Sequence, residues 1–406
     1  MARVLFVAES FHPVLGGGEK HIRDLSAALV RAGMPATVLT RRGRRDWPRE
    51  EMLDGARVLR VPPAGPGRVG KYAMVAPVMA AMRRERANYD VVMIPGTRIL
   101  GLPGLIAAHA LGKPAVLQAE MTGEMSGEIY VWGTPFQRPA IMRLLRPAIV
   151  ARNLWLRRAE AFVAISRPIE QEFLSAGLAR ARVVYIPHAV DVTRFRPAER
   201  DEAGALRGRL GLPPDALLMT YTGRLLKGKG LEVFVAALAQ IAPSAPQAHA
   251  VIVGAGGGQS LSIEEPLKEQ VRSAGLAARV TFTGRVENVE EYLRASDVFV
   301  FPSLFEGLPH SIVEAAAAGL PMAASRAGGI PDVVEHEGNG ILVEPGDVSQ
   351  LAAALRRLIG EPQTRARMAA RARATACERF ALAAVARQYR DLFESLVERR
   401  PVHPPA

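Results

Sequence analysis

Two glutamates, Glu306 and Glu314, lie on either side of an expected helix start in the stretch EGLPHSIVEAAAAGLP. The apolar run over 298–301 predicts a buried strand, which Pro302 and Ser303 end. Ser311 and Glu314 have the spacing of an S-x-x-E capping box, and this gives Glu314 a structural reason. Glu306 has no such reason. A loop carboxylate at the end of a strand is suited to accept hydrogen bonds from the hydroxyl groups of a sugar.

Two cations, Arg224 and Lys229, occupy the glycine-rich stretch TGRLLKGKG between a strand and a helix. Positive charge beside a helix N-terminus opposes the helix dipole, and a bound anion would reverse that cost. Arginine offers a planar fork of donors and lysine a point charge, which together suit a diphosphate. A solvated basic turn is the alternative interpretation.

Two further glycine clusters follow expected strands. Gly17 and Gly18 precede Glu19 at the start of a helix, where backbone N–H groups can approach a phosphate. The alternative is a tight turn that needs positive φ. The cluster over 254–258 is similar to a dinucleotide-binding fingerprint, but Gln259 replaces the final glycine. We interpret it as a loop close to a ligand or to a helix.

Strand-like and helix-like runs alternate along most of the chain, which is typical of α/β proteins with parallel sheets. The alternation breaks over 187–210, a stretch rich in charge, proline and glycine, and then resumes with helices expected at 231–241, 261–274 and 289–295. The pattern predicts two doubly wound, Rossmann-like domains over 1–190 and 191–381. An amphipathic last helix over 382–399 is expected to cross back to the first domain.

The composition limits the cellular setting and the partners. The chain of 406 residues has a single cysteine, Cys377, so an intramolecular disulfide is excluded and a reducing cytoplasm is expected. The apolar start of the chain predicts a first strand and not a signal peptide. A net charge of +12 favours an anionic partner: nucleic acid, a membrane surface or an anionic substrate.

Five ordered motifs resemble the family-four retaining glycosyltransferases of GT-B architecture. They are GGGEKHIRDLSAALVRAG, VAISRPIEQEFLSAG, VVYIPHAVDVTRFRP, GRLLKGKG and EGLPHSIVEAAAAGLP, and GGIPDVVEHEGNGILVEPGD follows them. The resemblance covers nearly the whole chain. It implies two domains facing across a cleft and a nucleotide-diphospho-sugar as donor.

The resemblance also implies roles for single residues. Arg224 and Lys229 would hold the donor diphosphate, Glu306 would bind donor sugar hydroxyls, and Glu314 would bind the ribose. The remaining expected donor contacts are Gly17, Gly18, Gly284, Arg285, Val286, Gly307, Leu308, His310 and Ser311, with Gly284, Arg285 and Val286 lining the base. The resemblance implies an enzyme without cofactor or metal. Consistently, the sequence has no D-x-D motif, and the cations would replace a metal.

The sequence departs from the family pattern at two places. His188 and Ala189 stand where the family often has Asn-Gly. Glu120, followed by Glu124, stands at the end of the strand over 114–119, where the family often has a histidine. Either glutamate is a candidate for contact with the donor sugar or the acceptor.

The acceptor is expected to be a hydroxyl compound of unknown class. Helical stretches over 71–86 and 138–158 mix apolar residues with arginine, so they could contact an anionic membrane or cover the core. The runner-up functions are a sugar-nucleotide epimerase on the same architecture and a basic nucleic-acid-binding protein. Against the latter, the chain has no basic-aromatic RNA motif and only 6% aromatic residues, so we expect no nucleic acid partner.

Overall fold

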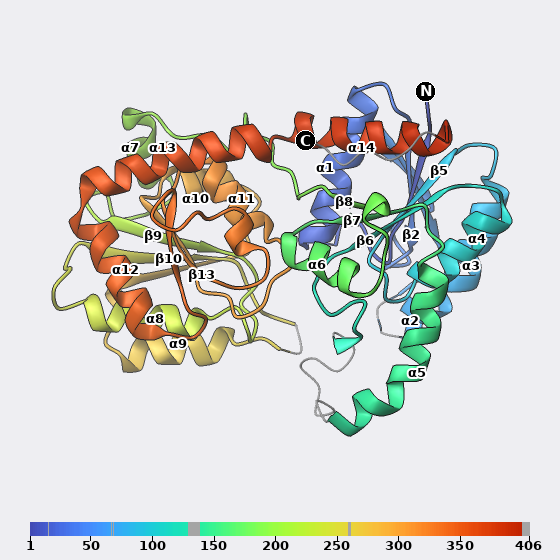
Figure 1. The fold of residues 1–406 in the computed structure, drawn as a ribbon. Coiled ribbons are helices and arrows are strands. Elements are labelled where there is room, and N and C mark those ends of the chain that lie inside the picture. Colours follow the sequence, from blue (N-terminus) through green and yellow to red (C-terminus); the bar gives the residue numbers. More distant parts are fainter. Residues whose placement is uncertain (15, 66, 68, 129–138, 259–260, 400–406) are drawn as a thin grey trace. The chain divides into compact units, whose positions relative to one another are not determined.

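The computed structural model divides the chain into two compact units. Unit 1 comprises residues 1–189 and 382–406, and unit 2 comprises residues 190–381 (Figure 1). The structure describes the whole chain except residues 15, 66, 68, 129–138, 259–260 and 400–406. Each unit is built on its own sheet and is described separately here.

Unit 1 contains a sheet in the spatial order β3-β4-β2-β1-β5-β6-β7-β8, parallel except for the β3–β4 pair. Its strands are β1 (Val4–Val7), β2 (Ala36–Arg41), β3 (Glu50–Leu53), β4 (Ala56–Val61), β5 (Val91–Pro95), β6 (Ala115–Ala119), β7 (Ala161–Ala164) and β8 (Val183–Tyr185). The central strands are buried along their length, because helices cover both faces of such a sheet.

Helices alternate with the strands along most of unit 1, and the last helix follows all of the strands. The helices are α1 (Gly17–Arg31), α2 (Val69–Ala73), α3 (Val75–Arg84), α4 (Gly101–Ala110), α5 (Pro139–Leu156), α6 (Arg167–Ser175) and α14 (Leu382–Val397). The expected helix over 71–86 is therefore two helices, and the antiparallel edge strand β3 was not predicted.

The last helix of the chain completes the core of unit 1. α14 lies against α1 (Figure 1), and its apolar face joins the hydrophobic core of this unit. Phe393 meets Phe6 of β1 edge to face, with the ring centroids 6.4 Å apart. Burying such an aromatic side chain contributes about 1.5–3 kcal/mol, so α14 is a structural part of unit 1.

Unit 2 contains a parallel six-stranded sheet in the order β11-β10-β9-β12-β13-β14. Its strands are β9 (Leu217–Thr222), β10 (Ala248–Val253), β11 (Val280–Gly284), β12 (Val298–Phe301), β13 (Met322–Ser325) and β14 (Gly340–Val343). Its helices are α7 (Arg200–Arg209), α8 (Leu231–Ile241), α9 (Glu264–Ser273), α10 (Val289–Arg294), α11 (His310–Ala317), α12 (Val348–Gly360) and α13 (Pro362–Arg379).

Helical periodicity explains why α8 was predicted with its observed ends. Its buried residues recur at helical spacing, and the sequence-based range 231–241 matches the helix. The stretch over 187–210 is less irregular than expected. It contains α7, because Glu199 and Glu202 form a capping box that starts this helix.

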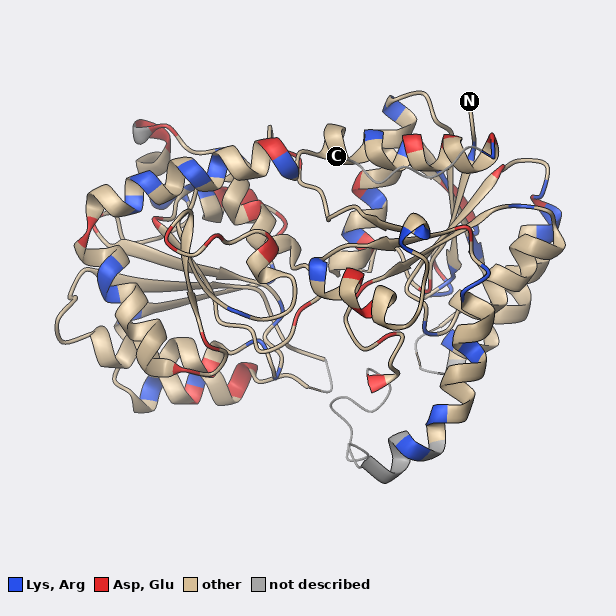
Figure 2. Ribbon diagram, in the orientation of Figure 1, with Lys and Arg blue, Asp and Glu red and all other residues tan. Residues whose placement is uncertain are grey.

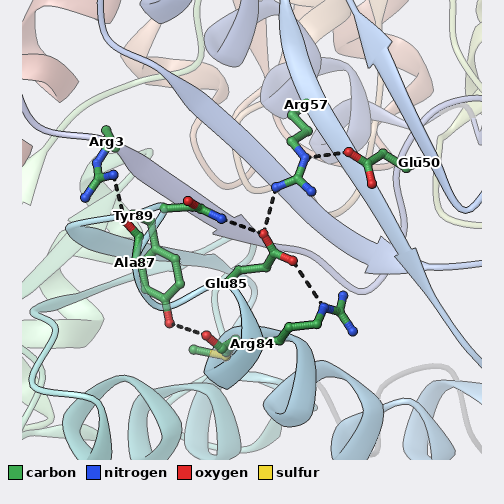
Figure 3. Close-up of polar contacts among 9 residues, drawn as sticks. Arg3, Glu50, Arg57, Arg84, Glu85, Ala87 and Tyr89 are labelled. Carbon is green, nitrogen blue, oxygen red and sulfur yellow. Dashed lines mark hydrogen bonds and ion pairs between the residues drawn. The ribbon is translucent and has the colours of Figure 1, made fainter.

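The edge strands of unit 1 carry a structural network of charges (Figure 3). Arg57 of β4 donates to Glu50 of β3 and to Glu85 after α3, each at 2.7 Å. Nearby, the buried Tyr89 hydroxyl donates to the carbonyl of Met82 at 3.0 Å. These contacts join the edge strands to the end of α3.

Helix α5 is largely exposed where its side chains are described. Leu145, Val150, Leu154 and Trp155 are exposed, and α5 carries arginines but no Asp or Glu (Figure 2). No described helix has the length and apolar character needed to cross a membrane.

Candidate active site

The strand order of unit 2 creates a switch point beside β9. From β9 the chain passes first to β10 on one side and later to β12 on the other. At such a point the loops at the strand C-termini diverge, and ligands of doubly wound sheets bind there. The loop after β9 carries Arg224 and Lys229, and the loop after β12 carries Glu306.

Lys229 and Glu306 meet across this switch point. Lys229 Nζ lies 2.6 Å from Glu306 Oε1, and the side chains are 22% and 10% exposed, respectively. The Ser303 hydroxyl donates to the same oxygen at 2.7 Å. The cation and the carboxylate that were predicted from separate motifs therefore form one charge pair that solvent still reaches.

A glycine makes this approach sterically possible. Gly230 has a φ of +69°, and a Cβ there would lie 1.9 Å from the carbonyl oxygen of Pro302. Any side chain at this position would push apart the loops after β9 and β12. No local sequence pattern indicates this contact, since it depends on which strands are neighbours.

Arg224 lies in an exposed turn that a buried tyrosine holds. Tyr221, at the end of β9, stacks on Phe301 of β12 and donates its hydroxyl to the carbonyl of Arg224 at 3.1 Å. Burial raises the pKa of Tyr221, with the charge of Glu306 adding to the rise, so the hydroxyl stays protonated and can donate. Within the described part of the chain, no carboxylate pairs with the Arg224 guanidinium.

Tyr221 and Ser303 support the candidate site through their hydroxyl groups, and the sequence motifs did not indicate either residue. Both are fully buried, at the end of β9 and just after β12. A polar side chain at the end of an apolar strand was the available signal. It does not reveal which neighbour the hydroxyl group bonds.

The predicted capping box at α11 is wrong. The helix already begins at His310, its N-cap is Pro309, and no side chain caps it. Ser311 is therefore the second helical residue and cannot serve as the N-cap. Glu314 lies one turn inside the helix and is 6% exposed, so its burial calls for an explanation other than capping. The helix ends at Ala317, and Gly319, the residue after its C-cap, has a φ of +71°.

The other expected donor contacts of unit 2 lie at the same edge of the sheet. Leu308 and His310 are buried, whereas Ser311 is half-buried. The carbonyl of Gly307 accepts from the amide of Gly329 at 2.7 Å. Gly284 ends β11, followed by exposed Arg285, and Val286 packs partly against the hydrophobic cluster around α7.

The glycine cluster after β10 binds a side chain of its own unit. The amides of Gly256 and Gly257 donate to Oε2 of Glu264 at 2.8 and 3.1 Å. These backbone bonds and Lys268 hold the pKa of Glu264 below its usual range. The loop is thus close to the start of α9. Gln259, which replaces the final glycine of the fingerprint, lies outside the described residues.

In unit 1, Gly17 and Gly18 are the first two residues of α1. Gly16 before them is extended at a φ of −164°, so the cluster does not form a positive-φ turn. A Cβ at Gly18 would lie 3.4 Å from Oε2 of Glu120, which follows β6. The glycine therefore allows the start of α1 to approach a carboxylate.

Glu120 and Glu124 have different environments. Glu124 is 1% exposed and clamps two loops: Oε2 accepts from the amide and the hydroxyl of Thr97, each at 2.7 Å, and Oε1 accepts from the amide of Glu120 at 2.8 Å. Burial raises the pKa of Glu124. This arrangement favours a structural role for Glu124, whereas the side chain of Glu120 is 26% exposed.

Family models, curated proteins and solved structures were each compared with this chain, and all three comparisons find glycosyltransferases. The family model described as "Glycosyl transferases group 1" matches residues 204–375, and the one described as "Glycosyltransferase Family 4" matches residues 15–194. The chain is 29% identical over 404 residues to a D-inositol 3-phosphate glycosyltransferase of Xylanimonas cellulosilytica, covering 95% of this chain and 93% of the relative.

A second relative is the lipopolysaccharide core biosynthesis mannosyltransferase LpsB of Rhizobium meliloti. It is 28% identical over 339 residues, covering 76% of this chain and 93% of the relative. Among solved structures, HepE of Anabaena in complex with UDP-glucose superposes with a TM-score of 0.76 at 24% identity, covering 97% and 100% of the two chains. The fold class predicted from the sequence is confirmed, and the chain belongs to the group 1 glycosyltransferases of GT-B fold.

Proposed function

We propose that this enzyme transfers a sugar from a nucleotide-diphospho-sugar to a hydroxyl acceptor and retains the anomeric configuration. The observation that carries the proposal is the Lys229–Glu306 pair at the switch point of unit 2. A cation there can face a diphosphate, and a carboxylate beside it can accept hydrogen bonds from sugar hydroxyls.

Each residue has a distinct part in the proposed reaction. Arg224 and Lys229 bind the diphosphate and stabilise the charge that grows on it as the bond to the sugar breaks. Glu306 orients the sugar through its hydroxyls, and Glu314 holds the ribose. The acceptor oxygen attacks from the face that the diphosphate leaves, and a phosphate oxygen takes the acceptor proton.

The donor is proposed to be a UDP- or GDP-linked hexose. HepE has been crystallised with UDP-glucose, and LpsB is named a mannosyltransferase. The test is hydrolysis of UDP-glucose and GDP-mannose, followed by rapid proton NMR of the released sugar. Both donors carry α-linked sugars, so retention gives the α-anomer first. Initial release of the β-anomer would exclude retention, and conversion of the intact donor to an epimer would favour the epimerase alternative.

Metal independence is a further part of the proposal. The fixed cations Arg224 and Lys229 and the N-terminus of α11 would supply the charge that a metal provides in other transferases. Turnover should therefore survive excess EDTA. Loss of turnover in EDTA that magnesium restores would contradict this part.

We also propose that α5 contacts an anionic membrane, which would bring a lipid-linked acceptor within reach. Leu154 and Trp155 are exposed beside arginines, and the Arg158 guanidinium lies 4.0 Å from the Trp155 ring centroid. Exposed apolar residues with arginine and no acid are typical of helices that lie in a membrane interface. Nucleic acid is not proposed as a partner.

Vesicle sedimentation tests this membrane contact. Wild-type protein should bind phosphatidylglycerol vesicles and not phosphatidylcholine vesicles, and Arg143→Glu with Arg146→Glu should weaken the binding. The matched control is Arg367→Glu with Arg371→Glu on α13, which makes the same charge change on another exposed helix. Equal loss in both variants would indicate unspecific attraction by net charge.

A further inference from the structure

A chain of hydrogen bonds in unit 1 joins the last helix to the end of β6. The Tyr389 hydroxyl of α14 donates to Oε1 of Gln118 at 2.7 Å, and Nε2 of Gln118 donates to Oε1 of Glu120 at 2.6 Å. Tyr389 and Gln118 are fully buried, whereas Glu120 is partly exposed. The chain therefore begins in the core and ends at a carboxylate that a ligand can reach.

Donor and acceptor chemistry fixes the direction of this chain. An ionised carboxylate only accepts, so Gln118 must turn its amino group to Glu120 and its oxygen to Tyr389. Burial holds the pKa of Tyr389 well above its usual value, which keeps the proton on the hydroxyl. Without that hydroxyl, Gln118 loses the contact that favours this orientation of its amide.

The neighbours of Glu120 keep it ionised. Its Oε2 lies 3.7 Å from Nε2 of His188, and His21 packs against His188 with the ring centroids 4.5 Å apart. Burial raises the pKa of Glu120, but the contacts with His188, His21 and Gln118 outweigh that effect, so the pKa lies below its usual value. Gly18 adds the positive end of the α1 dipole.

This environment selects the chemistry of a ligand. A carboxylate already lies at the N-terminus of α1, so this end of the helix repels a phosphate and can bind a neutral donor of hydrogen bonds. Glycines at the start of α1 were predicted to approach a phosphate or a sugar. The position of Glu120 favours the sugar.

We infer that Glu120 binds a hydroxyl group of a sugar, and that Tyr389 positions Glu120 by fixing the amide of Gln118. This inference rests on the proposed sugar transfer. The hydroxyl can belong to the donor sugar or to the acceptor. A rotated Gln118 amide would point its oxygen at the carboxylate, and Glu120 would have to turn away from its position.

Tyr389→Phe tests the inference, with Tyr89→Phe as a matched control. Each variant removes one buried hydroxyl from unit 1, but Tyr89 bonds the carbonyl of Met82 and precedes the N-terminus of β5, whereas Gln118 lies at the C-terminal end of β6. The assays are UDP-glucose and GDP-mannose hydrolysis, sugar transfer to inositol and to methyl α-mannoside, and calorimetric binding of UDP and GDP. The more reactive donor is used for the comparison.

Tyr389→Phe should lower kcat/KM by about tenfold to a hundredfold, as expected when a hydrogen bond to a charged group is weakened, and Glu120→Gln should have the same effect. Tyr89→Phe should leave kcat/KM unchanged, and all variants should bind nucleoside diphosphate like the wild type. A fall in hydrolysis assigns the hydroxyl to the donor sugar. A fall only in transfer to a carbohydrate assigns it to the acceptor.

The pH profile separates positioning from a general loss of structure. The acidic limb of kcat/KM should move to higher pH in Tyr389→Phe, because Glu120 loses part of the donor set that keeps it ionised. Of the titratable groups around Glu120, His188 and Glu124 keep their contacts, whereas Nε2 of His21 loses its 3.4 Å contact with the Tyr389 hydroxyl. If Tyr389→Phe matches Tyr89→Phe in every assay, the inference is wrong. If the wild type reacts with neither donor, the proposed function fails instead.

Discussion

Lys229 of the loop after β9 and Glu306 of the loop after β12 form a charge pair at 2.6 Å, and the buried Ser303 hydroxyl shares the same carboxylate oxygen. The pair links the residue proposed to hold the diphosphate with the residue proposed to hold the sugar. Removing either partner should therefore affect the other, since a partly buried charge would lose its counterion.

Lys229→Ala should lower the turnover of sugar transfer by about a hundredfold or more, as loss of one preorganised charge does in other enzymes. Lys227→Ala is the control, because it removes an exposed cation from the same turn. Steady-state kinetics on both variants measure the effect. Near-normal turnover in Lys229→Ala would remove this lysine from the catalytic residues.

Glu306→Gln should fold like the wild type and bind nucleoside diphosphate with similar affinity, while sugar transfer falls. The amide has nearly the size of the carboxylate, but it accepts hydrogen bonds more weakly. Ser303→Ala should lower transfer less, because it removes only one of the two donors to Oε1. Normal transfer by Glu306→Gln would show that the carboxylate serves the structure of the loop.

Glu314→Gln and Ser311→Ala separate ribose binding from helix capping. Because Ser311 does not cap α11, Ser311→Ala should change the free energy of unfolding by less than the ~1 kcal/mol that loss of an N-cap costs. Glu314→Gln should weaken UDP or GDP binding by about tenfold, the scale of one hydrogen bond to a charged group. Calorimetry and urea unfolding measure the two effects, and unchanged nucleotide affinity in Glu314→Gln would contradict the ribose contact.

His21 should make unit 1 sensitive to acid. Burial lowers its pKa to about 3, and the charge of His188 adds to that effect while Glu120 opposes it. Below pH 6.5 the unfolded chain binds a proton that the folded chain does not, so stability is full above pH 6.5 and falls towards pH 3. The loss from this group between pH 7 and pH 5 is about 2 kcal/mol.

Urea unfolding of wild type and His21→Phe at pH 7 and pH 5 checks this prediction. Residues 190–381 of unit 2 contain no tryptophan in the sequence, and Trp47 and Trp155 lie in unit 1, so tryptophan fluorescence reports the unfolding of unit 1. The variant should lose less stability on acidification than the wild type. Equal losses would show that His21 does not control the acid response.

The sequence predicted most of the architecture because the patterns that specify it are local. Alternation of apolar runs indicated the two doubly wound sheets, and helical periodicity predicted α8 with its observed ends. The edge strand β3 was missed, since its residues alternate weakly and pair only with β4. The prediction of a capping box was wrong because its residue spacing requires Ser311 to precede the helix, whereas the helix already begins at His310.

Contacts between segments that are distant in the chain could not be predicted from local sequence patterns. The motifs identified Lys229 and Glu306 separately, but their pairing depends on β9 and β12 being neighbours and on the glycine at 230. Likewise, no local pattern relates Gly18 to Glu120 or Tyr389 to Gln118, since these pairs form only when α1, α14 and β6 pack together.

Calorimetric titration with UDP and with GDP tests the central claim most directly: that the edge of unit 2 binds a nucleoside diphosphate through Arg224 and Lys229. The wild type should bind one of the two nucleotides, and replacing both cations by alanine should weaken that binding by about a hundredfold, the scale of two charge-assisted contacts. Failure of the wild type to bind either nucleotide, or equal affinity in the double variant, would contradict the account.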